Sequence, residues 1–163
     1  MKLAICPGSY DPVTKGHINV IERAARVFSQ LVVAVTYNPA KVGVFSVEER
    51  MEMLRLATAH IPNVTIESCD SLIAEYAEKR GAVALVKGLR AVTDFDYEFQ
   101  MALINRKLNP KLETVFITAS EEFMYLSSSA VREVAHFGRD ISDFVPSCVK
   151  DMVQQRLWEQ AKE

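Results

Sequence analysis

The architecture predicted for this chain starts from one segment, Pro7-Gly8-Ser9-Tyr10-Asp11-Pro12-Val13-Thr14-Lys15-Gly16-His17. It follows a short apolar run over residues 3–6, which is typical of a buried strand, and Pro7-Gly8 ends that strand. Beyond His17, apolar residues recur at positions 18, 21, 25 and 28, which is helical spacing. The segment is therefore predicted to be a turn from a strand into a helix.

The beginning of this predicted helix suits a phosphate group. The first N–H groups of a helix lack partners within it, and its dipole is positive at this end. Gly16 places no side chain in the way, and His17 could donate to the same anion. Neither G-x-G-x-x-G nor G-x-x-x-x-G-K-[ST] occurs, which excludes the two better-known phosphate loops. From spacing alone, His17 could equally be a surface histidine at a helix start.

Length and charge narrow the class of protein. A chain of 163 residues favours one domain, over residues 1–163. A net charge of −2 gives no basic surface, so we expect no nucleic acid as the main partner.

The cysteines and the apolar runs indicate where in the cell the protein is expected. Cys6, Cys69 and Cys148 are an odd number at wide spacing, which favours free thiols in a reducing compartment. With no C-x-x-C or H-x-x-x-H pair, a zinc site is not indicated. No signal peptide is recognised, and no apolar run is long enough to span a bilayer, so we expect a cytoplasmic protein without a membrane partner.

Strand and helix patterns alternate along the rest of the chain. Apolar runs over 31–35, 64–67, 82–86 and 114–118 predict four more strands. Helical patterns lie between and after them, including one from Thr93 with Phe95, Phe99 and Ala102 turned inward, and a last helix from Pro146. This alternation implies βαβ units and a parallel α/β sheet.

Cations and serines follow several strands, at the edge where α/β proteins bind ligands. Lys41 follows the second strand, and Lys87-Gly88-Leu89-Arg90 follows the fourth. The two cations of the second segment point to an anion, and the arginine can hold phosphate oxygens bidentately. Ser127-Ser128-Ser129 begins a helix and could form a second anion seat, although one serine would suffice as a cap.

Three segments together resemble the nucleotidyltransferase superfamily. Residues 7–17 resemble its T/H-x-G-H motif, residues 87–98 its central motif, and residues 126–132 its I-S-S-[ST]-x-x-[RK] motif. They occur in the right order over nearly the whole chain. The central segment is most similar to bacterial phosphopantetheine adenylyltransferases.

The resemblance implies a fold, two substrates and a set of residue roles. The fold is an α/β Rossmann-like five-stranded parallel sheet with helices on both faces. The substrates are ATP, with magnesium, and 4′-phosphopantetheine. Ser9 orients the attacking phosphate and contacts ATP, and His17 stabilises the charge developing at the α-phosphorus. The other implied contacts are Lys41, Lys87 and main-chain groups near Ile73 for phosphopantetheine, and Tyr10, Gly88, Leu89, Arg90, Glu98, Phe123, Met124, Tyr125, Leu126, Ser127, Ser128 and Ser129 for ATP.

Lys41 and Arg90 also belong to the implied catalytic set, whereas no residue is assigned as a metal ligand. The family further suggests a homohexamer and feedback binding of coenzyme A.

This sequence departs from the family pattern at three positions. The family often has threonine at Ser9, phenylalanine at Tyr10 and arginine at Lys87. Lys87 keeps the charge but loses the bidentate geometry.

Three other functions compete with adenylyl transfer to phosphopantetheine. A sister transferase with another phosphorylated acceptor, or with CTP, shares the first and last motifs. A class I synthetase fragment lacks room for a tRNA-binding domain. A catalytically silent nucleotide-binding sensor is disfavoured because Ser9, His17, Lys41 and Arg90 are all present.

Overall fold

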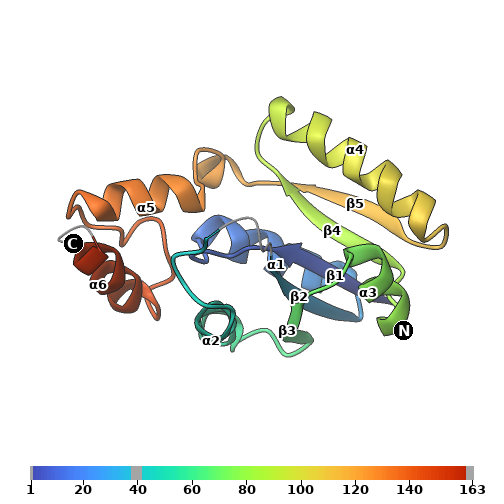
Figure 1. Cartoon of the computed structure of the whole chain (residues 1–163), viewed down its shortest axis with the longest axis horizontal. Coiled ribbons are helices and arrows are strands. Elements are labelled where there is room, and N and C mark those ends of the chain that lie inside the picture. The colour runs from blue at the N-terminus through green and yellow to red at the C-terminus, as the bar shows by residue number, and fades with distance from the viewer. Residues whose placement is uncertain (1, 38–41, 161–163) are drawn as a thin grey trace.

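The computed structural model describes residues 2–37 and 42–160 and contains one parallel five-stranded sheet (Figure 1). The strand order is β3-β2-β1-β4-β5, and every neighbouring pair is parallel. The strands are β1 Leu3–Gly8, β2 Gln30–Thr36, β3 Val64–Cys69, β4 Ala84–Leu89 and β5 Glu113–Thr118. The predicted α/β sheet is therefore confirmed.

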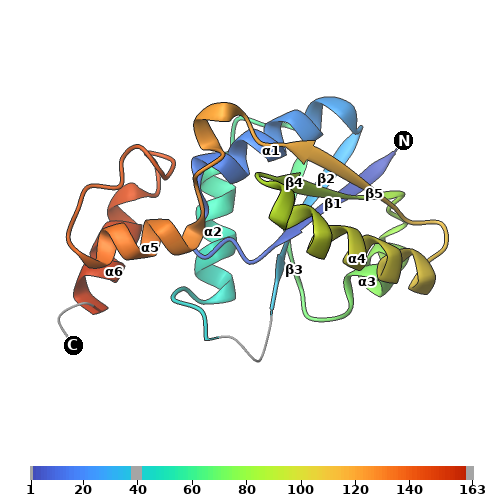
Figure 2. The ribbon, with the colours of Figure 1, turned by 90° about the horizontal axis from the view of Figure 1, so that it is seen from above.

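Helices cover both faces of the sheet, as the family resemblance implies (Figure 2). They are α1 Lys15–Val27, α2 Val47–Thr58, α3 Ile73–Arg80, α4 Val92–Leu108, α5 Ser128–His136 and α6 Lys150–Gln160, with a 3-10 turn η1 at Glu121–Phe123. Helices α5 and α6 pack against each other at one end of the molecule, where the C-terminus lies, and the N-terminus lies at the other end (Figure 1).

Two hydrophobic cores form because neighbouring residues of a strand point to opposite faces. Cys6, Val33 and Val86 pack with α1, α2, α5 and α6 on one face. Ile5 and Leu85, each one residue earlier in its strand, pack with α3 on the other face. A strand buried on both faces reads as a continuous apolar run, which is the pattern from which β1, β2 and β4 were predicted.

Helix α4 departs from the prediction. Phe95 and Phe99 were expected to point inward, but they are 40% and 48% exposed. Their rings stack on each other with centroids 5.4 Å apart, and Phe95 also meets Phe116 of β5 edge-on. Large apolar residues occur around the whole circumference of this helix, so helical spacing alone could not identify the face that packs against the sheet.

The last helix begins later than predicted, at Lys150 rather than Pro146. The predicted inner face is nevertheless correct, since Val149, Val153 and Leu157 are all buried.

Candidate active site

A cavity of about 1110 Å³ opens at the carboxyl ends of β1 and β4. The chain leaves these two neighbouring strands in opposite directions across the sheet, β1 toward β2 and β4 toward β5. Such a switch point is where open α/β sheets bind ligands. The predicted site residues that line this cavity are Ser9, Tyr10, His17, Lys87, Gly88, Arg90, Glu98, Phe123, Leu126, Ser127, Ser128 and Ser129.

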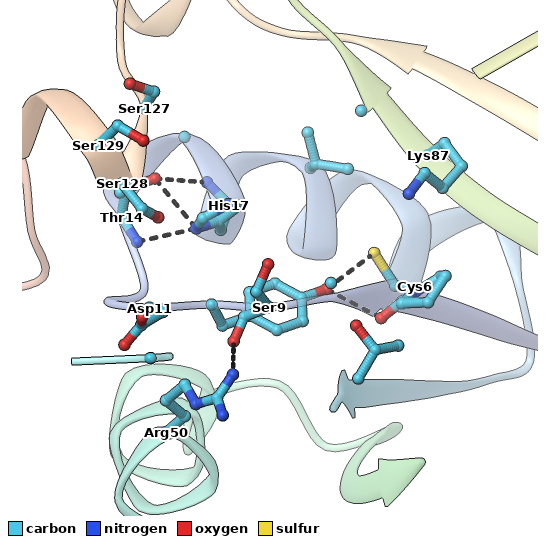
Figure 3. Close-up of a pocket in the computed structure, with 18 of the residues that line it drawn as sticks. Cys6, Ser9, Asp11, Thr14, His17, Arg50, Lys87, Ser127, Ser128 and Ser129 are labelled. Atoms are coloured by element: carbon cyan, nitrogen blue, oxygen red, sulfur yellow. Dashed lines mark hydrogen bonds between the residues drawn. The ribbon is translucent and has the colours of Figure 1, made fainter. Parts of the chain in front are cut away.

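Helix α1 begins with a capping box formed by Thr14 and His17, in which the histidine replaces the usual glutamate or glutamine. The backbone N–H of His17 donates to Thr14 Oγ1 over 3.2 Å, and the N–H of Thr14 donates to His17 Nδ1 over 3.0 Å (Figure 3). Nδ1 must therefore be the unprotonated ring nitrogen. Nε2 carries the proton and is the nitrogen that can donate to a ligand.

The imidazole of His17 is neutral at physiological pH. Burial, together with the nearby cations Arg90 and Lys87, lowers the pKa of His17 to about 4. The site thus presents a neutral N–H donor near two positive charges.

The predicted anion seat at the start of α1 is partly filled by the protein itself. Lys15 N–H donates to the carbonyl of Phe144 over 2.9 Å, and His17 N–H is taken by Thr14. Two of the first three helical N–H groups therefore have protein partners. The histidine side chain, rather than a row of main-chain donors, is the main contribution of this turn.

The turn before α1 is tied to α2 by contacts that the sequence analysis missed. Arg50, buried in α2, donates to the carbonyl of Ser9 over 2.9 Å. The buried carboxylate of Asp11 accepts from the N–H groups of Val44 and Phe45, each over 2.9 Å. These partners lie 33 or more residues away along the chain, so no local pattern could reveal them.

At the end of β4, both predicted cations are paired with acids from α4. Lys87 Nζ lies 3.3 Å from Glu98 Oε1, and Arg90 Nε lies 3.4 Å from Asp94 Oδ2. Arg90 also donates to the carbonyl of Leu126 over 2.8 Å, which joins β4 to the serine segment.

Gly88 allows a close approach between α1 and β4. A Cβ atom at this position would come within 3.1 Å of Val20 Cγ2 in α1. The group that approaches Gly88 is therefore a core side chain.

The three serines lie beside Thr14 and His17 (Figure 3). Ser127 caps α5 by accepting from Ala130 N–H over 3.1 Å, so the capping interpretation holds for this residue. Ser128 Oγ donates to the carbonyl of Pro12 over 2.7 Å. The serine segment is thereby held against the β1–α1 turn.

The remaining predicted residues lie in other places. Ile73 lines a smaller adjoining cavity of about 230 Å³, which shares Ser9, Lys87 and Glu98 with the larger one. Leu89, Met124 and Tyr125 are not among the lining residues of either cavity, and Met124 and Tyr125 are 49% and 65% exposed. Lys41 lies outside the described residues.

The fold and this site define a nucleotidyltransferase of the cytidylyltransferase-like class. The cytidylyltransferase-like family model matches residues 5–134. A crystal structure from Vibrio parahaemolyticus, assigned as a nicotinate-nucleotide adenylyltransferase, has the same fold with a TM-score of 0.67 and 16% sequence identity. The similarity covers 99% of this chain and 94% of that one.

Within this class the chain belongs to the phosphopantetheine adenylyltransferase family. The phosphopantetheine adenylyltransferase of Caldanaerobacter subterraneus subsp. tengcongensis is 54% identical over 99% of both chains. That of Symbiobacterium thermophilum is 53% identical over 88% of both chains. That of Heliobacterium modesticaldum is 51% identical over 91% of this chain and 89% of its own.

Proposed function

We propose that this chain transfers the adenylyl group of ATP to 4′-phosphopantetheine, giving dephospho-CoA and pyrophosphate. The observation that carries the proposal is 54% identity to a phosphopantetheine adenylyltransferase over 99% of the chain. The cavity at the ends of β1 and β4 supports it, because neutral and cationic donors there surround a space large enough for a nucleotide.

In this reaction a phosphate oxygen of phosphopantetheine attacks the α-phosphorus of ATP. A new P–O bond forms as the bond from the α-phosphorus to the bridging oxygen breaks, and pyrophosphate leaves with that electron pair. The attacking group is already an anion, so no strong base is required. Catalysis then consists of positioning and charge stabilisation.

His17 is proposed to stabilise the charge that develops on the α-phosphate oxygens. Thr14 holds Nδ1, so Nε2–H is directed as a donor before the substrate arrives. A donor fixed in this way needs no reorganisation in the transition state.

Lys87 and Arg90 are proposed to bind phosphate groups of the substrates. Each is now paired with a carboxylate at 3.3–3.4 Å, and a phosphate that carries more charge can compete for the same cation. Lys87 borders both cavities, which suits a contact with phosphopantetheine, whose arm would extend toward Ile73. Ser9 and Lys41 complete the set expected from the family.

Magnesium is proposed to enter as its complex with ATP. Within residues 2–37 and 42–160, no group of three or more His, Cys, Asp or Glu side chains could hold a metal ion. The triphosphate would supply the ligands instead.

A homo-oligomer, the hexamer of the family resemblance, is also proposed. Helix α4 supports it because its exposed apolar side chains gather on one element. These are Val92, Phe95, Tyr97, Phe99, Leu103, Ile104 and Leu108. Light scattering of the purified protein measures the assembly directly.

Two further points are proposed for the cellular setting. Coenzyme A would bind as a feedback ligand, because it contains the phosphopantetheine arm. The location would be the cytoplasm, because all three cysteines are free thiols. No helix in the described part of the chain is long and apolar enough to cross a membrane.

The test is pyrophosphate release with ATP, magnesium and 4′-phosphopantetheine, with each substrate omitted in turn. Release that requires both substrates, with dephospho-CoA identified by mass, is the expected result. Release with CTP in place of ATP would assign a cytidylyl transfer. ATP binding without release for any phosphorylated acceptor would indicate a nucleotide sensor.

A further inference from the structure

Tyr10 has an unusual backbone in the middle of the β1–α1 turn. Its φ is 51°, in the left-handed region that residues other than glycine seldom adopt. A bulky side chain in this region is often found at functional sites, where surrounding contacts hold the strained conformation. The contacts made by Tyr10 therefore indicate what the conformation achieves.

The tyrosine ring is held from β1 on two sides. Its O–H donates to the carbonyl of Cys6 over 2.8 Å and lies 3.4 Å from Cys6 Sγ. The ring also covers Gly8 closely, since a Cβ atom there would lie 3.0 Å from two ring carbons. Tyr10 is only 4% exposed, so its side chain forms part of the cavity wall and does not extend into the space for ATP.

The same ring packs against the catalytic histidine. The centroids of Tyr10 and His17 lie 5.0 Å apart with an interplanar angle of 73°, an edge-to-face contact. Thr14 fixes the imidazole through Nδ1. The imidazole is thus held by a hydrogen bond at one nitrogen and by a ring contact.

We propose that Tyr10 is a positioning residue for adenylyl transfer, which acts by fixing the imidazole of His17 and not by binding ATP with its own side chain. This inference rests on the proposed function. The family resemblance implies that Tyr10 contacts ATP. The proposal differs, because it assigns the Tyr10 side chain the role of holding His17.

Two variants separate the ring from its hydroxyl group. Tyr10→Gly removes the ring while accepting the left-handed backbone, and Tyr10→Phe removes only the O–H. We expect Tyr10→Gly to lower kcat by about tenfold or more, with both KM values within about threefold of wild type, because the histidine loses its orientation. Tyr10→Phe should keep kcat within about threefold.

Titration of His17 followed by NMR gives a readout that does not depend on turnover. Burial is the main cause of its low pKa, and the charged groups facing it are Arg90 and Lys87. Without the Tyr10 ring, water reaches the imidazole, and its pKa should rise from about 4 toward 6.5. In Tyr10→Phe the pKa should stay near the wild-type value.

Tyr76→Phe is the matched control, because Tyr76 donates to Glu67 and lines neither cavity. It should leave kcat and the His17 titration unchanged. Thermal unfolding is measured for each protein, and if Tyr10→Gly does not fold, Tyr10→Asn replaces it, since asparagine also tolerates positive φ.

The proposal is overturned if ring removal raises the KM for ATP with unchanged kcat, or leaves the titration of His17 unchanged. If wild-type protein releases no pyrophosphate, the proposed function fails, while the titration still decides whether Tyr10 acts on His17.

Discussion

The two turns that border the cavity are held in different ways. In the β1–α1 turn, Tyr10, Asp11 and Thr14 are at most 9% exposed, and the side chain of each bonds to main-chain groups. In the β4–α4 turn, the Lys87 and Arg90 side chains are 27% and 40% exposed and pair with carboxylates. The first turn is fixed before any substrate binds, whereas the second carries charges that can exchange partners.

This difference indicates that the first turn should act mainly in catalysis and the second mainly in substrate binding. A group held rigidly toward the reacting atoms affects kcat, because its orientation is set in advance. A cation that leaves one anion for another affects mainly the affinity for substrate. Substitutions in the two turns should therefore change different kinetic constants.

His17→Ala should lower kcat about 100-fold or more, because it removes a donor directed at the developing charge. The KM values should change little. His17→Gln is the matched variant, since glutamine at this position keeps the capping box with Thr14. Steady-state pyrophosphate release measures kcat and KM for both variants. An unchanged kcat in the alanine variant would remove His17 from the mechanism.

Lys87→Ala should raise the KM for phosphopantetheine by about tenfold or more, as expected for the loss of a charged hydrogen bond, with a smaller change in kcat. Lys87→Arg should bind phosphopantetheine as tightly as wild type or more tightly, because the guanidinium can bind phosphate bidentately. Isothermal titration with each variant measures these affinities. A large loss in Lys87→Arg would show that the site requires a compact ammonium group.

Asp11→Asn should lower the free energy of unfolding by about 1–3 kcal/mol, because one of its two buried main-chain donors loses its acceptor. The kcat should fall as well, since this carboxylate joins the turn that carries His17 to the segment before α2. Asp143→Asn, at an exposed acid outside the cavity, is the control and should alter neither quantity. Urea unfolding combined with the activity assay provides the comparison.

The pH dependence of stability should show a contribution from His17. Its pKa is about 4 in the folded protein and near 6.5 in the unfolded chain, so the unfolded state binds the proton first as pH falls. The contribution is complete above about pH 6.5 and is lost as pH falls from there toward 4. Urea unfolding of wild type and of His17→Gln over this pH range isolates the contribution of His17. Identical dependences of stability on pH would contradict a buried neutral imidazole.

Much of the fold could be predicted because the sheet leaves a direct pattern in the chain. Strands buried on both faces appear as uninterrupted apolar runs, and Leu31 to Val35 is the clearest case. Helix α4 was harder, since its large apolar residues surround the helix. Whether Phe95 and Phe99 are buried or exposed depends on what packs against the helix, and local spacing does not encode this.

The candidate site was predicted in part. The motif residues near His17, Lys87 and Ser127 do line one cavity. The roles of Arg50 and Asp11 were missed. In a sequence, a buried arginine in a helix or a buried aspartate in a turn cannot be distinguished from a solvated one. The carboxylate partners of the cations were also not foreseen as ion pairs.

The alternating elements, the family motifs and the strand ends at which they lie can be predicted from the sequence, because these features depend on neighbours along the chain. The folded structure is needed to show which ring nitrogen of His17 is free to act and which groups hold Tyr10, Asp11 and Lys87 in place. Those outcomes depend on hydrogen bonds, ring contacts and ion pairs that form only when the chain has folded and the side chains have reached their partners.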